Sequence, residues 1–66
     1  MNKYVAIEGG REREIASAAL HEAVQHCVAN KASLYWVNGR GYHPLVDRGE
    51  ITPLGEYERN RLDQHT

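Results

Sequence analysis

Two histidines and one cysteine are the first candidates for chemistry in this chain. His21, His26 and Cys27 fall within a segment that its apolar pattern predicts as a helix. A zinc-binding HExxH motif needs its histidines four residues apart, so that both project from one helix face. Here the spacing is five residues, which turns the two rings about 140° apart around a helix. We therefore expect no metal site, and a single cysteine supplies neither a multi-cysteine zinc site nor an internal disulfide.

The neighbouring pair Cys27 and His26 raises the question of nucleophilic catalysis. Adjacent helical residues diverge by about 100° and do not face each other. Cys27 also falls within the apolar stripe of the helix, where a buried thiol is an ordinary small hydrophobic group. No acid–base pair stands at a usable spacing elsewhere, so the sequence predicts a protein that is not an enzyme and has no cofactor.

A predicted β-hairpin carries the residues most suited to binding. Asn38-Gly39 lies between two runs of β-forming residues and is a strong signal for a two-residue turn. The resulting register places Tyr35 opposite Tyr42 and lays Trp36 over Gly41. One face of the hairpin then carries Leu34, Trp36 and His43, and the other carries Tyr35, Val37, Arg40 and Tyr42.

Tyrosine and arginine are enriched at binding hot spots, because they offer large contact areas and directed hydrogen bonds. We therefore expect Tyr35, Arg40 and Tyr42 to contact a partner, with His43 and Arg48 near the rim of that surface. Two structural alternatives stay open: the tyrosine pair only stabilises the hairpin, or the last helix covers it.

The charge balance bears on the class of partner. Eight Lys and Arg residues against nine Asp and Glu residues give a net charge of −1. Because neutralisation of phosphates dominates nucleic-acid affinity, this balance favours a protein partner. A nucleic-acid-binding domain that uses the hairpin with Arg48, Arg59 and Arg61 is the alternative.

Further segments complete the predicted domain, which spans residues 1–66. Lys3–Ile7 reads as a strand that ends at Gly9-Gly10, where the chain turns into a helix from about Arg11 to Asn30. This turn before a helix could also bind an anion. Pro44 is expected to end regular pairing, and a short apolar plug (Leu45-Val46) and a turn at Asp47–Glu50 follow it. Thr52 and Pro53 form an N-cap and first position for a last helix to about Asp63.

The order β-α-β-β-α predicts an α+β domain: a three-stranded sheet, one long amphipathic helix on it and a short C-terminal helix. The default pairing of the first strand with the hairpin is parallel. Eight apolar residues give the long helix an apolar arc of about 220°, too wide for one small sheet to cover. A second element, or a second subunit, should lie against its other edge.

The length of 66 residues limits the core, so self-association as a homodimer or a partner protein is expected. No apolar run is long enough to cross a membrane, and the first residues lack the hydrophobic stretch of a signal peptide. Together these observations predict a small cytoplasmic protein that regulates or inhibits another protein by binding it.

Overall fold

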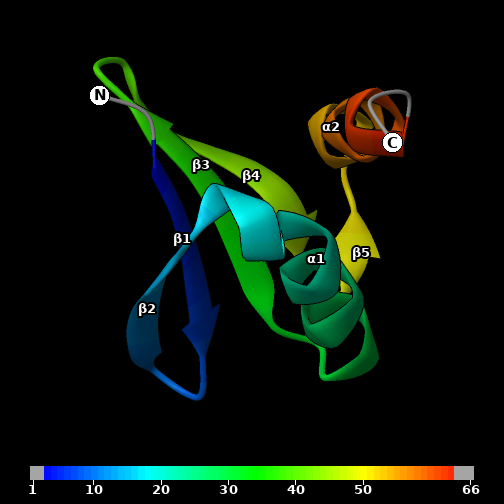
Figure 1. The fold of residues 1–66 in the computed structure, drawn as a ribbon. Helices are drawn as coiled ribbons and strands as arrows, with labels where there is room; N and C mark the ends of the chain where they lie inside the picture. The colour runs from blue at the N-terminus through cyan, green and yellow to red at the C-terminus, as the bar shows by residue number, and fades with distance from the viewer. Residues whose placement is uncertain (1–2, 64–66) are drawn as a thin grey trace.

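The structure is a computed structural model that describes residues 3–63 (Figure 1). It confirms the α+β class, but the sheet has five strands where three were predicted. No helix in the described part of the chain is long and apolar enough to cross a membrane. The elements are β1 (Lys3–Glu8), β2 (Arg11–Ile15), a 3-10 turn η1 (Ser17–Ala19), α1 (Leu20–Ala29), β3 (Ser33–Asn38), β4 (Gly41–Asp47), β5 (Glu50–Ile51) and α2 (Pro53–Asp63).

The prediction of one helix from Arg11 to Asn30 is wrong in its first half. Gly9 and Gly10 have φ angles of +59° and +80°, the left-handed values of a two-residue hairpin turn, so the chain reverses into β2. The sequence Arg-Glu-Arg-Glu-Ile also alternates with the strand period of two, which the four-residue apolar spacing obscured. Helix α1 therefore begins only at Leu20, and no helix N-terminus follows the glycines to bind an anion.

The inserted strand changes the topology of the sheet. The strand order is β2-β1-β3-β4-β5, and every neighbouring pair is antiparallel. The parallel pairing expected for the first strand is therefore wrong. Because β2 carries the chain back along β1, the crossover through α1 starts at the opposite end of the sheet and returns β3 antiparallel to β1.

The β3–β4 hairpin forms as predicted, but its turn lies one residue later. Asn38 pairs with Gly41, and Gly39-Arg40 forms the turn. The Asn38 side chain accepts a hydrogen bond from the Arg40 N–H at 2.7 Å, which favours this placement. The ring of Trp36 consequently faces His43, with centroids 5.5 Å apart, and does not lie over Gly41. The faces predicted for the strand residues are unchanged, because the opposing pairs move by an even number of residues.

Pro44 does not end the pairing as expected. It stands opposite Tyr35 within β4, beside an irregularity at which the register shifts by one residue. The extra residue is Leu45, and such a bulge lets two successive side chains point the same way. Leu45 and Val46 are both fully buried, so the predicted apolar plug is part of a strand.

Both helices pack on one side of the sheet and share one core (Figure 1). Helix α1 lies over β1, β3 and β4, while α2 lies against β4 and β5. From β2, Ile15 packs against the same core, which accounts for one edge of the wide apolar pattern in the sequence. The buried residues of this core are Tyr4, Ala6, Leu20, Ala23, Val24, Cys27, Ala32, Leu34, Leu45 and Val46.

The start of α2 agrees with its prediction. The Thr52 hydroxyl oxygen accepts a hydrogen bond from the Gly55 N–H at 3.1 Å, as an N-cap does. Gly55 allows the close approach of helix and strand, because a Cβ there would lie 2.0 Å from the carbonyl oxygen of Leu45. Further along, Glu58 is buried beneath α2, and Arg61 Nη2 lies 2.9 Å from one of its oxygens.

Candidate protein-binding surface

The sheet has one face covered by helices and one face that no described helix covers. Residues on this second face share it because side chains alternate along a strand and opposite residues point the same way. The register places a largely apolar group there, which we call the open face: Val5, Ile7, Tyr35, Val37, Tyr42 and Pro44. Antiparallel sheets usually turn polar residues toward solvent, so this composition is unusual for an uncovered face.

Two tyrosines dominate the open face. The rings of Tyr35 and Tyr42 lie 6.0 Å apart in an edge-to-face arrangement. Tyr35 is half-buried, whereas Tyr42 is 54% exposed. Val5, between the cross-strand neighbours Tyr35 and Glu14, is only 2% exposed even though it lies outside the helical core. Side chains of the sheet itself therefore cover the middle of this face and leave an aromatic surface above it.

The charges at the margins of the open face differ from side to side. Strand β2 contributes Glu12 and Glu14, which stand opposite Ile7 and Val5 and are exposed. Lys3, also exposed, stands opposite Val37 at one end of β1. An apolar centre beside an acidic edge thus gives the open face a polarity that a partner would have to match.

The structure brings together only part of the predicted binding set. Arg40 lies exposed in the hairpin turn at the end of the open face. His43 points to the covered side, where its ring packs against Trp36 and its Nε2 lies 3.1 Å from the Asn38 side-chain oxygen. Arg48 lies in the β4–β5 turn at the other end of the sheet, and its N–H donates to the Ser33 hydroxyl at 3.2 Å.

The three arginines of the nucleic-acid alternative do not gather beside the tyrosines. Arg59 and Arg61 lie on α2, on the helical side of the sheet. Each forms an ion pair within that helix, Arg59 with Glu56 at 3.2 Å and Arg61 with Glu58 at 2.9 Å. With Arg48 at the far turn, the open face lacks the row of cations that would follow a phosphate backbone.

The histidines of α1 point in different directions, as their spacing predicts. His26 Nε2 lies 2.8 Å from a carboxylate oxygen of Glu8 on β1, whereas His21 is 3.1 Å from the Gln25 side chain. Over the residues that the structure describes, no cluster of three His, Cys, Asp or Glu side chains is arranged to hold a metal ion.

Cys27 is buried and 1% exposed. Its sulfur lies 3.7 Å from the carbonyl oxygen of Ser33. Burial raises the pKa of the Cys27 thiol, the nearby Glu8 carboxylate adds to that increase, and Arg13 opposes it. A thiol with these surroundings is a weak nucleophile, because the reactive form is the thiolate.

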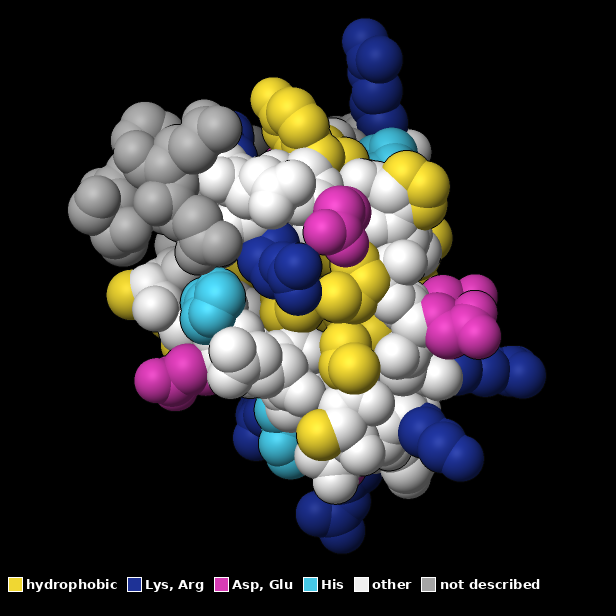
Figure 2. All heavy atoms as spheres, turned by 90° about the vertical axis from the view of Figure 1, so that its right-hand side faces the viewer, with side chains coloured by type: hydrophobic (Ala, Val, Ile, Leu, Met, Phe, Trp, Pro, Cys, Tyr) yellow, Lys and Arg dark blue, Asp and Glu magenta, His cyan; other side chains and the backbone are white. Residues whose placement is uncertain are grey.

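An apolar groove lies on the helical side of the sheet. It has a volume of about 220 Å³ and is lined by Val24, Gln25, Val28, Ala29, Ile51 and Arg59. Figure 2 shows hydrophobic side chains gathered on this face, with a basic and an acidic side chain lying across them. Val28, an apolar residue of α1, lines this groove and is 37% exposed.

Sequence reasoning found the two tyrosines but missed the contributions of β1 and β2 to the same surface. The signals were present: Gly9-Gly10 suits a hairpin turn, and in the four residues that follow arginine and glutamate alternate with the period of a strand. Comparison with known proteins adds no relative, because no family model, curated protein or solved structure matches this chain.

Proposed function

We propose that this chain is a small protein-binding regulator or inhibitor, without catalytic activity, whose open face contacts the partner. The observation that carries this proposal is the apolar and aromatic composition of an uncovered sheet face. Its centre is apolar and its two tyrosines are of a type enriched at binding hot spots. A face of this kind loses unfavourable contact with water when a partner covers it.

The charges select the chemistry of the partner. The acidic edge formed by Glu12 and Glu14 favours a partner that presents an apolar patch bordered by lysine or arginine. Arg40, at the end of the face, suits an acidic residue at the opposite border. A second copy of this chain is one outcome of the test, since a homodimer would cover the same face.

The chain offers a matched pair of substitutions for the test. Tyr42 is 54% exposed on the open face, and Tyr57 is 61% exposed on α2. The Tyr42→Ala and Tyr57→Ala variants remove the same side chain at similar exposure from different surfaces. Urea unfolding of both proteins would first verify that each is folded.

Light scattering at two concentrations would measure the mass of the wild-type protein and both variants. Immobilised proteins would then be used to capture partners. We expect Tyr42→Ala, and the triple variant with alanine at Tyr35, Arg40 and Tyr42, to weaken a captured complex or a dimer at least tenfold. Tyr57→Ala should bind as the wild type does. Equal binding by the triple variant and the wild type would show that the open face is not the site.

A further inference from the structure

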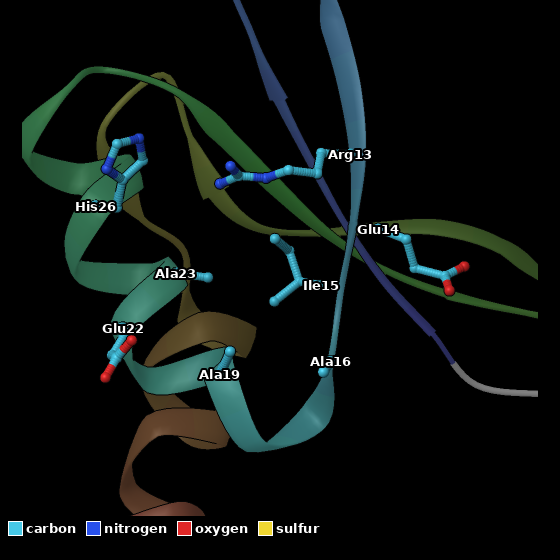
Figure 3. A pocket seen from close by; sticks show the side chains of 8 residues that line it. All are labelled: Arg13, Glu14, Ile15, Ala16, Ala19, Glu22, Ala23 and His26. Atoms are coloured by element: carbon cyan, nitrogen blue, oxygen red, sulfur yellow. The ribbon is translucent and has the colours of Figure 1, made fainter.

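The outer edge of β2 and the space beside α1 form a second surface, which meets the open face only along Glu12 and Glu14 (Figure 3). β2 is an edge strand of the described sheet, with β1 as its neighbour there. Every second residue of an edge strand directs its backbone N–H and C=O groups away from the sheet, where they can pair with an added strand. Five residues of β2 are long enough to receive a short extended peptide.

Helix α1 leaves space next to this edge. A cavity of about 360 Å³ lies between β2 and α1, with Ile15, Ala19 and Ala23 in its apolar wall. A second cavity, of about 410 Å³, lies beside Ala6, Glu8 and Arg11, and Arg13 lines both. We refer to the two cavities together as the β2 cleft. The cleft can accept the side chains that an added strand would direct to the helical side of the sheet.

Arginines of β2 face this cleft. Arg13 extends from β2 toward His26, while Glu14 points away from α1 and Glu22 away from Arg13 (Figure 3). Arg11 shares the face of Arg13 because it lies two residues away on the strand. Among the side chains that the structure describes, the ion pairs are His26–Glu8, Arg59–Glu56 and Arg61–Glu58, so both β2 arginines are free.

The charge order of β2 disfavours its antiparallel pairing with the same strand of a second copy. In an antiparallel ladder, opposite residues have side chains on the same face of the sheet. Both arginines of β2 point to one face of the sheet, and Glu12 and Glu14 point to the other. Any antiparallel register between two copies of β2 therefore places arginine opposite arginine or isoleucine, and glutamate opposite glutamate. Like charges that are directly opposite destabilise a strand pair. The edge therefore selects a strand with the inverse order of charges.

We propose that the β2 edge binds an extended peptide segment in which acidic and basic residues alternate. The backbone of the peptide pairs with β2. Its acidic side chains enter the β2 cleft and meet the guanidinium groups of Arg11 and Arg13, while its basic side chains meet Glu12 and Glu14. Charge-assisted hydrogen bonds between arginine and carboxylate supply the specificity. This site shares Glu12 and Glu14 with the acidic edge of the open face, but it does not use the tyrosines Tyr35 and Tyr42.

Two synthetic peptides of identical composition test the proposal. In the first, of eight residues, glutamate and lysine alternate; in the second, four glutamates precede four lysines. Each is added to the isotope-labelled protein while backbone amide resonances are followed by NMR. We expect the alternating peptide to bind at least tenfold more tightly than the block peptide, with shifts in β2 and in the part of α1 that lines the cleft.

Variants in β2 and in the β3–β4 hairpin test whether the peptide binds at β2 or elsewhere on the molecule. The double variant Arg11→Gln and Arg13→Gln should weaken binding of the alternating peptide at least tenfold, and Glu12→Gln with Glu14→Gln should also weaken it. Arg40→Gln, which removes one exposed charge from the β3–β4 hairpin, and Tyr42→Ala should leave binding unchanged. Equal affinity for the two peptides, an unchanged affinity of the arginine variant, or shifts at Tyr35, Val37 and Tyr42 without shifts in β2 would overturn the proposal. The spectrum of each free variant verifies its fold.

Discussion

The two faces of the sheet are built from alternate residues of the same strands, yet they differ in what covers them. On the helical face, Tyr4, Ala6, Leu34 and Val46 are all buried beneath α1 and α2. On the open face, Val5 is buried, but Tyr35 and Val37 are half-buried and Tyr42 is largely exposed. Stability and binding potential are thus divided between the faces: helix packing supplies the first, and uncovered apolar area supplies the second.

This division suggests that the open face can change without loss of the fold. Residues that contact both helices contribute to the cooperative unit, whereas an uncovered side chain has fewer partners to lose. The chain has 66 residues, and domains of this size are stable by about 3–10 kcal/mol. Shortening one side chain in the core can therefore unfold a large fraction of the protein molecules, whereas shortening one side chain on the open face should not.

The largest expected effect comes from shortening Leu34, which is fully buried at the centre of the helical face. Leu34→Ala should reduce the free energy of unfolding by about 3 kcal/mol, because it removes buried methyl groups and leaves a cavity. Val37→Ala, on the open side of the same strand, should cost about 1 kcal/mol or less. Urea unfolding of both variants measures the two losses, and equal losses would refute the division between the faces.

A smaller loss is expected where α2 meets the sheet. In Gly55→Ala, the gain in helix propensity of about 1 kcal/mol is outweighed by steric overlap that costs about 2–3 kcal/mol. The cause is the carbonyl oxygen of Leu45, 2.0 Å from the added Cβ. Gly39→Ala is the matched control, since nothing lies within 4 Å of the added carbon there. We expect a lower urea midpoint for Gly55→Ala only; a gain in stability at Gly55 would contradict the tight contact.

The sequence predicted the division between the faces of the β3–β4 hairpin but not the full extent of the sheet. The hairpin could be predicted because the β-forming residues Leu34, Tyr35 and Trp36 and the turn residues near them are local signals. The turn lies one residue later than predicted, where the Asn38 side chain accepts a hydrogen bond from the Arg40 N–H.

Strand β2 was missed for a different reason. Residues from Arg11 to Ile15 fit the charge and apolar pattern of a helix as well as that of a strand, and their partner β1 comes earlier in the chain. Tertiary pairing decides such cases, because strand formation depends on neighbours more than on intrinsic preference. The same limit applies to the open face, since the apolar residues of β1 join the tyrosines of β3 and β4 only through the strand order.

The smallest expected effect is a loss of stability at alkaline pH that originates on the helical face. Burial raises the pKa of Tyr4, with a further increase from Glu58 against the opposing influence of Arg61, and burial likewise raises the pKa of Cys27. Each group keeps its proton in the folded state at a pH where the unfolded chain has lost it. Their stabilising contribution is therefore complete below the unfolded pKa and declines as pH rises through the folded pKa.

The ordinary pKa values are 9.0 for the thiol and 10.0 for the phenol, so the decline should begin near pH 9. Urea midpoints measured from pH 7 to pH 10.5 would reveal it. In Cys27→Ala the first part of the decline should disappear, while the part due to Tyr4 remains, because only the thiol has been removed. Tyr42→Ala, which removes an exposed phenol, should leave the dependence of the urea midpoint on pH as it is in the wild type. A midpoint that is constant up to pH 10.5 would mean that the helical face does not favour the protonated groups.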